Sequence, residues 1–325
     1  MAIIGHWKTL AEAQKLVQDK LLISGVIETI IEEGQLLPKL PIFAIDSKSI
    51  LYNREKSLPS AAFYAIGDQI PWLAAVDYDQ VELSLTRVAL AEVLDNFMLK
   101  TYKNPNDYRA QILRELTKGS LRTIEDSIIY GDVAVSNQFS GLHKIAAAGS
   151  AYNATSAGGS GALSLAQLRL AIDSVKPKPD LALMPFELQR RIDAAMWEAG
   201  LSANSIIRVA TDAAGLGGRV TYFEGTPIVP SDYLVAETSL GAKYVSGTKY
   251  YTVFLVRLGQ LLEGGICMAV GGETGGPDFF RVIELDELED YDAAGIRLVA
   301  YCALAMGSTK ALARIYGITD VAIVA

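Results

Sequence analysis

The sequence predicts an α+β protein in which an α/β unit is inserted into a second unit built around one long helix. Hydrophobic residues make up 50% of the 325 residues and the mean hydropathy is +0.24, so the chain can bury a large core. One helical pattern near residue 120 is much longer than an average globular helix, and strand-like segments far along the chain have no partners nearby in sequence. Single cores seldom grow much beyond ~250–300 residues, so at this length we expect one large domain or two domains that share a sheet.

Residues 1–41 are predicted to form an N-terminal arm. The segment Thr9–Glu12 has the pattern of a capping box, and apolar residues follow it at helical spacing to about Gly34. The prolines of Leu36–Pro41 fix φ and favour an extended backbone, so the helical part of the arm ends before them.

Residues 42–85 are predicted to form a long two-stranded excursion. Two strand-like segments, Ser49–Arg54 and Ala62–Ile66, flank the charged and polar segment Glu55–Ser60. An isolated two-stranded ribbon is only marginally stable in water, so this one needs a surface on which to lie.

Two helices are predicted after the excursion. The first covers about Thr86–Tyr102. The second begins at Asn104–Pro105, an N-cap followed by a proline at the first helical position, and ends near Tyr130. It would be about 26 residues, or about 39 Å, long, and we call it the spine helix. The segment Ile145–Leu168, rich in Ala, Gly and Ser, is predicted to be a surface loop.

Residues 163–241 have an α/β pattern. A second capping box, Ser164–Gln167, predicts the start of a helix that ends before Pro177. The elements expected after it are a buried strand at 181–184, a helix at 186–199, and strands at 206–209 and 220–223.

The last part of the chain is dominated by strand patterns, with a helix as the alternative for the final one, at 250–257, 266–270, 279–284 and 296–306. These strands have no independent partners, so we expect them to return to the spine helix. Residues 86–162 and 242–325 would then form one unit, with 163–241 inserted into it.

The charge balance argues against a nucleic-acid-binding function. Twenty-nine Lys and Arg stand against 37 Asp and Glu, a net charge of −8, whereas a protein that grips phosphates needs an excess of cations. No signal peptide or membrane-spanning pattern is present, so no membrane partner is expected. Cys267 and Cys302 have neither metal nor disulfide-framework spacing and are interpreted as small core residues.

The sequence offers little to an enzyme. Neither of its two histidines, His6 and His143, has a Ser, Cys or Asp at triad-like spacing. Gly215–Arg219 precedes a strand, which favours a glycine turn over a phosphate site, and Asp286–Asp292 is more typical of a solvated acidic face than of a cation site. We therefore expect no catalytic, cofactor-binding or metal-ligating residues and no cofactor.

The order of these elements resembles the major capsid protein of tailed bacteriophages, which has the Hong Kong ninety-seven fold. The resemblance rests on Ile124–Asp132, similar to the family's Glu-x-x-[Ile/Leu]-[Ile/Leu]-x-Gly-Asp at the end of the spine helix, and on Phe139–Leu142, which supplies the following Gly-Leu. Downstream, Asp180–Pro185 and Gly225–Asp232 resemble two signatures of the family's axial domain. Each motif is short, but together their order covers nearly the whole chain.

The resemblance implies a structural protein that assembles with itself. It implies hexamers and pentamers of an icosahedral shell around a double-stranded DNA genome, with residues 42–85 (the E-loop) lying across a neighbouring subunit. Residues 86–162 and 242–325 would be the peripheral domain and 163–241 the axial domain around the capsomer axis. It also implies a portal protein and, where they are used, separate scaffolding and decoration proteins as partners, with assembly in the cytoplasm of a bacterial host and a final place in the virion. DNA would be contacted only by non-specific proximity.

Four residues are the candidates for assembly contacts, namely Arg54, Glu55 and Lys56 in the excursion and Arg219 in the loop expected at the capsomer axis. Two other functions stay open. The same fold serves in encapsulins, which enclose cargo enzymes, and the α/β unit alone is compatible with a soluble enzyme that binds a small molecule.

Overall fold

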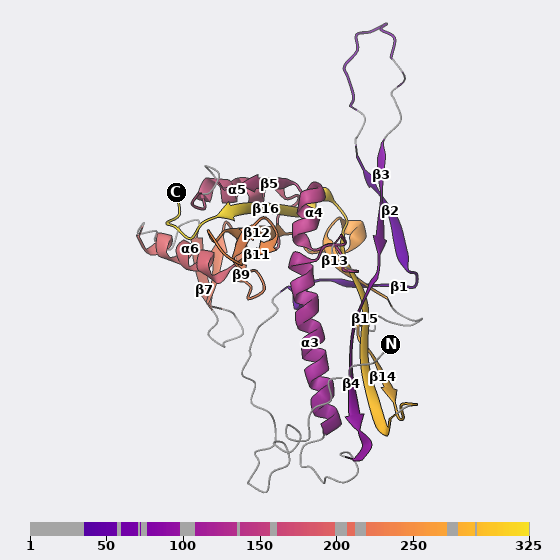
Figure 1. Cartoon of the computed structure of the whole chain (residues 1–325). Helices are drawn as coiled ribbons and strands as arrows, with labels where there is room; N and C mark the ends of the chain where they lie inside the picture. The colour runs from indigo at the N-terminus through magenta and orange to yellow at the C-terminus, as the bar shows by residue number, and fades with distance from the viewer. Residues whose placement is uncertain are drawn as a thin grey trace.

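The computed structural model describes residues 36–56, 60–70, 72, 77–97, 108–134, 137–156, 161–198, 207–211, 219–271, 279–289 and 291–324. The expected N-terminal helices and the start of the spine helix at Asn104–Pro105 lie outside these residues. Figure 1 shows the arrangement: the long helix α3 (Tyr108–Tyr130) lies between an elongated sheet and an α/β unit, and a thin hairpin projects from the end of the sheet.

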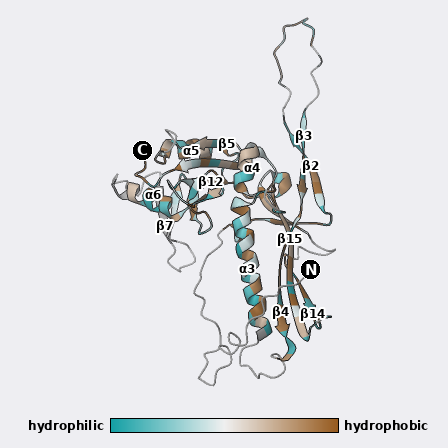
Figure 2. Ribbon diagram, viewed as in Figure 1, coloured by the Kyte–Doolittle hydropathy of each residue, from teal (hydrophilic) through white to brown (hydrophobic). Residues whose placement is uncertain are grey.

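The elongated sheet has five strands. β15 pairs antiparallel with β13, β14 and β4, and β1 pairs parallel with β13. The strands are β1 (Ile42–Ile45), β4 (Thr86–Asp95), β13 (Ile266–Gly271), β14 (Arg281–Leu285) and β15 (Ala293–Met306). Figure 2 shows that β15 is hydrophobic over much of its length. β15 is thus a strand, and the helical alternative for this segment is wrong.

The helix predicted over residues 86–102 is wrong for residues 86–95, which form β4, whereas residues 96 and 97 are helical. Its Ala, Leu and Glu residues favour a helix, and its apolar residues recur at spacings that fit one. All ten residues instead pair with β15, from Thr86 opposite Cys302 to Asp95 opposite Ala293. A continuous ladder with a buried strand outweighs local helix propensity.

The spine helix α3 ends at Tyr130, as predicted, and contributes to two cores. Its first half buries Ile112 and Leu116 against residues of β4 and β15, including Leu94 and Ile296. Its last turns bury Ile124, Ile128 and Ile129 in the largest core, which extends over β13 and the end of β15. Burial of each such side chain contributes about 1.5–3 kcal/mol to the free energy of folding. Because these side chains lie in two cores, α3 links the two parts of the molecule.

The end of α3 is held by a close approach of two glycines. The Gly131 N–H donates to Ser127 O at 2.9 Å, and the Gly141 N–H donates to Gly131 O at 2.8 Å. A Cβ on Gly141 would lie 2.7 Å from Gly131 N and from Ser127 O, which is closer than real Cβ atoms come to backbone. The spacing of the Gly-Asp and Gly-Leu motifs therefore has a steric cause.

The surface loop predicted over Ile145–Leu168 is largely wrong. Helix α4 (Leu142–Gly149) and strand β5 (Tyr152–Thr155) occupy its first half. Leu142 and Ala146 are buried in the largest core, and β5 pairs parallel with β16. Alanine is the strongest helix former, so the small residues here indicate close packing rather than a loop.

The α/β unit contains a seven-stranded sheet in the order β5-β16-β12-β6-β9-β8-β7, with a second core beneath helices α5 and α6. Its remaining elements are α5 (Leu165–Ser174), β6 (Leu181–Met184), α6 (Phe186–Glu198), β7 (Ile207–Thr211), β8 (Arg219–Phe223), β9 (Thr226–Pro230), β12 (Tyr251–Val256) and β16 (Leu312–Ile318). Ser164 is the N-cap of α5 as predicted, but without the side-chain hydrogen bond of a capping box.

One predicted late strand, β12, and the unpredicted β16 lie outside the elongated sheet. Both belong to the seven-stranded sheet, where β12 pairs with β6 and β16. Phe254 and Val256 of β12 and Leu312 of β16 nevertheless belong to the core that the end of α3 enters, so these strands also reach the region of the spine helix. β9 and β16 were not predicted as strands. The seven-stranded sheet thus includes strands outside residues 163–241. The division into a domain of residues 163–241 and a domain of residues 86–162 and 242–325 stays a prediction.

We predict that Gly141→Ala lowers the free energy of unfolding by at least ~2 kcal/mol, because the new Cβ overlaps backbone atoms that cannot move independently. Its φ of −82° suits any residue, so the effect is steric rather than conformational. The measurement is urea unfolding of the unassembled protein.

The matched control is Gly119→Ala in the middle of α3, where a Cβ would meet only Leu90 Cδ1 at 3.5 Å. This variant should gain about 0.5–1 kcal/mol from reduced backbone entropy in the unfolded chain. An unfolding midpoint for Gly141→Ala that equals or exceeds the wild-type value would show that the two glycines are not a steric constraint.

Candidate assembly interface

The projecting hairpin consists of β2 (Ser49–Glu55) and β3 (Tyr78–Ser84), which pair over their full length from Ser49 opposite Ser84 to Glu55 opposite Tyr78. The predicted first strand is confirmed, but the second, at 62–66, is wrong: residues 62–65 have no regular structure and Gly67 lies in a turn. The β-forming residues of 62–66 pair with no strand among the residues that the structure describes, so their propensity is not realised there.

The hairpin carries large apolar side chains that the described part of the chain leaves exposed. Phe63, Ile66 and Trp72 have relative exposures of 107%, 109% and 101%, and Ile70 has 70%. We call these four residues the apolar tip. Large apolar side chains gathered on one projecting segment are typical of a surface that binds another protein.

The base of the hairpin is attached to the body through one face. Ile50 and Leu83 pack against the largest core, and beyond them Tyr52 and Arg54 make polar contacts with the end of β15. Side chains alternate between the two faces of a strand, so Leu51 (56% exposed) and Asn53 point away from the body.

The structure brings three of the four candidate assembly residues together. Arg54, Glu55 and Lys56 line a groove of about 530 Å³ between the hairpin base and the short helix η2 (Leu261–Glu263). Glu55 and Lys56 are exposed, whereas Arg54 is half-buried and bonded within its own chain. Arg219 begins β8 in the α/β unit, away from this group, and residues 212–218 before it lie outside the described residues.

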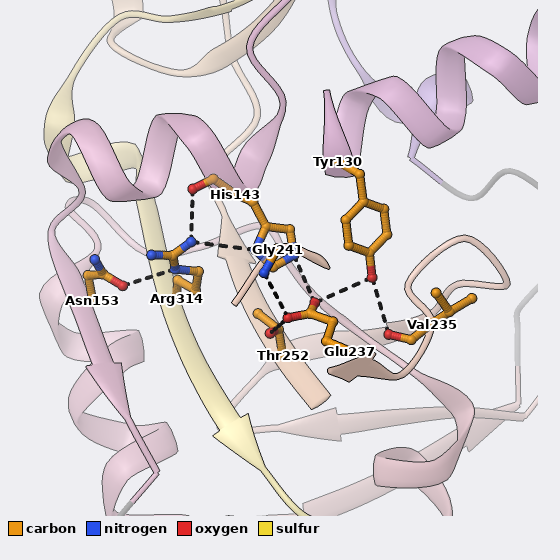
Figure 3. A network of polar contacts seen from close by, with 8 residues as sticks. All are labelled: Tyr130, His143, Asn153, Val235, Glu237, Gly241, Thr252 and Arg314. Atoms are coloured by element: carbon orange, nitrogen blue, oxygen red, sulfur yellow. Dashed lines mark hydrogen bonds and ion pairs between the residues drawn. The ribbon is translucent and has the colours of Figure 1, made fainter. Parts of the chain in front are cut away.

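A buried polar network joins the end of α3 to the α/β unit (Figure 3). Its centre is Glu237, 1% exposed, at the start of the short strand β10 (Glu237–Ser239). The Glu237 carboxylate accepts hydrogen bonds from the Tyr130 hydroxyl at 3.3 Å, the Thr252 hydroxyl at 3.1 Å and the Gly241 N–H at 3.1 Å. Its Oε1 also lies 3.0 Å from His143 Nε2. Four separate elements therefore meet at one carboxylate.

Arg314 of β16 continues the network on the other side of His143. Its Nη1 donates to His143 O at 2.8 Å and lies 3.4 Å from His143 Nδ1, and its Nε donates to Asn153 Oδ1 at 2.9 Å. An arginine cannot accept a hydrogen bond, so we assign the His143 proton to Nε2, the nitrogen that faces Glu237. Nε2 lies close to Glu237 Oε1 but makes no hydrogen bond, so the contact between them is electrostatic.

Burial governs the electrostatics of the network. Desolvation raises the pKa of Tyr130, and the nearby Glu237 charge raises it further, so the phenol stays a donor. Desolvation lowers the pKa of Arg314, which is 1% exposed. The His143 ring also stacks on Tyr130 with centroids 5.1 Å apart and meets Phe254 edge-on at 4.8 Å. Paired charges with packed rings around them hold one geometry at this junction.

A second buried carboxylate lies where the chain reaches the body from its N-terminal side. Glu125 of α3 is 3% exposed, and its Oε1 accepts the N–H of Leu37, the first residue of the short helix η1 (Leu37–Lys39), at 2.9 Å. Desolvation raises the pKa of this carboxyl above its ordinary value of 4.5 and outweighs the opposite effect of the Leu37 hydrogen bond.

The described residues contain no cluster of three His, Cys, Asp or Glu side chains that could hold a metal ion. Among the same residues, no helix is both long and apolar enough to cross a bilayer. Cys267 and Cys302 are buried and unbonded, as predicted, and burial raises the pKa of both thiols, to about 11 and about 12.

Comparison with known proteins gives a result in structure but not in sequence. No family model and no curated protein matches the chain. The chain is similar to the SrpI encapsulin of Synechococcus elongatus PCC 7942, with 17% identity, a TM-score of 0.70 and 97% of each chain covered. It is similar to the capsid of a native GTA particle, with 12% identity, a TM-score of 0.65 and coverage of 94% of this chain and 97% of that one. For the capsid of the cyanophage P-SCSP1u the identity is 10%, the TM-score 0.57 and the coverage 92% and 93%.

We predict that Glu237→Ala costs about 3–5 kcal/mol of unfolding free energy, because it leaves the buried Thr252 hydroxyl and the Gly241 N–H without their acceptor and removes the negative charge near the buried Arg314. The control is Asp320→Ala, which removes a surface ion pair with Arg191 whose side chains are 45% and 42% exposed. That change should cost less than ~1 kcal/mol. Equal losses in urea unfolding would mean that the network does not hold the junction.

A separate prediction concerns pH. A carboxyl whose pKa is raised by folding contributes stability that is complete below its unfolded pKa, near 4.5, and is lost as the pH rises through the raised value. Glu125→Gln keeps an oxygen acceptor for Leu37 but cannot ionise. The variant should therefore match the wild type at pH 4 and be more stable than it at pH 7. Unfolding free energies at both pH values test this, and a variant less stable at pH 7 would contradict it.

Proposed function

We propose, from the Hong Kong ninety-seven-like capsid fold that this chain has, that it is the major capsid protein of a tailed bacteriophage and assembles with itself into hexamers and pentamers of an icosahedral shell. The observation that carries the proposal is the apolar tip: a projecting hairpin presents four large exposed apolar residues that the described part of the chain leaves uncovered. Similarity to shell proteins over nearly the full length of the chain supports the same conclusion.

The geometry suits a subunit of a shell. The two sheets and α3 form one packed body, and the hairpin extends beyond it far enough to lie over a neighbour (Figure 1). Obligate interfaces bury on the order of 2,000–5,000 Å², which a single compact face seldom supplies but a body with a projecting arm does. In this assembly residues 163–241 form the axial domain, with Arg219 near symmetry-related copies.

The wider setting follows from the same proposal. The shell encloses double-stranded DNA, which it meets by proximity and not by sequence-specific contacts, consistent with a net charge of −8. A portal protein and, where they are used, scaffolding and decoration proteins are the other partners. Assembly takes place in the cytoplasm of the bacterial host, and the mature protein resides in the virion capsid. No catalytic role is part of the proposal.

The test replaces apolar side chains of the apolar tip by serine, a change that should not affect the fold of the subunit. The triple variant Phe63→Ser, Ile66→Ser, Trp72→Ser should keep the wild-type unfolding midpoint, because these side chains touch no core, but should form no particles. Electron microscopy and sedimentation velocity measure assembly. The control, Val245→Ser, removes an apolar side chain that is 85% exposed on another part of the surface and should assemble normally. Normal particles from the triple variant would refute the role of the apolar tip.

A second candidate is an encapsulin-type compartment, which the TM-score of 0.70 with an encapsulin over 97% of both chains favours. Both functions predict large closed particles, so size alone does not separate them. The contents of particles from the source cells do: nuclease-protected double-stranded DNA supports the capsid, and an enclosed protein without DNA supports the compartment. A small soluble oligomer with no particles would instead support the soluble enzyme.

A further inference from the structure

Among the described residues, the hairpin contacts the body at two levels. Near the body, Ile50 and Leu83 pack against the largest core. Farther out on the same face, Tyr52 and Arg54 reach the end of β15, and past them Glu55 and Lys56 are exposed. Tyr52 and Arg54 are therefore the outermost described contacts between hairpin strand β2 and the body.

The acceptors for these contacts are two consecutive backbone carbonyls. The Tyr52 hydroxyl donates to Met306 O at 2.9 Å, and Arg54 Nε donates to Gly307 O at 2.9 Å. Arg54 Nη2 donates to the Tyr52 hydroxyl at 2.9 Å and also bonds Met306 O. A charged donor with a fixed fork thus spans two adjacent acceptors, a geometry that restricts rotation as well as distance.

These acceptors are held in place from behind. The N–H of Gly307 donates to Gly265 O at 2.9 Å, and the N–H of Ser308 donates to Gly264 O at 3.2 Å. A Cβ on Gly307 would lie 2.7 Å from Gly264 Cα, so only glycine permits this approach. The loop after η2 therefore positions the carbonyls that Arg54 and Tyr52 bind.

Tyr52 and Arg54 also support one another. The Arg54 guanidinium carbon lies 5.3 Å from the centre of the Tyr52 ring, within cation–π range. Desolvation raises the pKa of Tyr52, and Arg54 lowers it by a smaller amount, so the hydroxyl remains protonated and donates. Loss of either side chain weakens the contacts of the other.

We infer that Arg54 is a positioning residue that, with Tyr52, clamps the hairpin to the end of β15 and sets the angle at which it leaves the body. The inference rests on the proposed function for its consequence in assembly, but the clamp itself is a property of the single chain. It assigns Arg54 to contacts within a subunit, whereas the sequence alone indicated a contact between subunits.

Small changes at the clamp have large effects at the apolar tip. An extended chain spans ~3.3 Å per residue, so Ile66 lies up to about 40 Å beyond Arg54. A tilt of about 10° at the clamp then moves the tip by roughly 7 Å, more than the spacing between adjacent strands. The clamp therefore controls where the apolar tip meets a second copy, and through this the curvature of the shell.

The experiment detects a change in the angle as a change in a distance, by pulsed electron paramagnetic resonance on the unassembled protein. Spin labels are placed on cysteines introduced by Ile66→Cys in the apolar tip and Leu121→Cys on α3, which are 109% and 36% exposed positions. Native Cys267 and Cys302 are 0% exposed and do not take up label. With Arg54 intact the distance distribution should be narrow.

Three variants define the clamp. Arg54→Ala should broaden the distribution at least about twofold, and Arg54→Lys, which keeps the charge but lacks the fork, should give an intermediate width. Tyr52→Phe keeps the ring and loses only the hydroxyl, so it tests the clamp with little risk to folding. Lys56→Ala is the matched control and should leave the distribution unchanged. A wild-type width in Arg54→Ala and Tyr52→Phe would overturn the inference.

Assembly is measured separately. Cryo-electron microscopy of wild-type particles should show one diameter, and Arg54→Ala particles should show several diameters or open sheets at an unchanged unfolding midpoint. Uniform Arg54→Ala particles of wild-type diameter would overturn the link between clamp and curvature. If the wild type forms no particles while Arg54→Ala still broadens the distance distribution, the clamp is upheld and the proposed function fails.

Discussion

The structure depends on the junction at the end of α3, where the backbones of Gly131 and Gly141 come too close to admit a side chain. This approach places the start of α4 beside the end of α3 and thereby brings Tyr130 and His143 to the buried Glu237 carboxylate. Because Glu237 and Arg314 belong to the α/β unit and Tyr130 to the spine helix, the polar network fixes the two parts relative to one another. A buried carboxylate is unfavourable unless it is fully paired, so the network tolerates few other arrangements.

The rigidity of this junction gives the hairpin its significance. With both sheets packed against one helix, the described structure has a single long projection, and its direction is set by the contacts at its base. Apolar packing of Ile50 and Leu83 is non-directional and would permit the hairpin to tilt, whereas the hydrogen bonds of Tyr52 and Arg54 to two fixed carbonyls depend on angle. At the base of the hairpin, apolar burial thus holds the hairpin on the body, and polar contacts set its direction.

The distribution of apolar residues distinguishes the interior of the subunit from its contacts. Strands β12, β13 and β15 bury nearly every residue, as expected for strands covered on both faces, while the apolar tip is left open to water. A soluble monomer gains nothing from exposed Phe63, Ile66 and Trp72, since each costs hydration free energy and favours aggregation. Their presence on the one projecting segment is consistent with a protein whose functional state contains many copies, and it agrees with similarity to shell proteins at only 10–17% identity.

The sequence by itself determined those elements whose identity depends on local pattern. Periodicity, prolines and turn residues predict the end of the spine helix at Tyr130, strand β6, helix α6 and the first hairpin strand, and all of these lie where predicted.

The tertiary structure decided the other elements. Residues 86–95 have helical propensity but form β4 because β15 offers a ten-residue ladder. Residues 62–66 have strand propensity but pair with no strand in the described part of the chain. The charges of the excursion predicted Arg54, Glu55 and Lys56 as assembly contacts. The hydrogen bond from Arg54 to the Gly307 carbonyl, 253 positions away, could not be predicted from the residues next to Arg54 in sequence. The same holds for Arg314 and His143, 171 positions apart, although a lone arginine in the apolar run 311–315 was a signal of a buried, paired charge. Local pattern is encoded over a few residues, whereas long-range pairing depends on which surfaces the folded chain brings together.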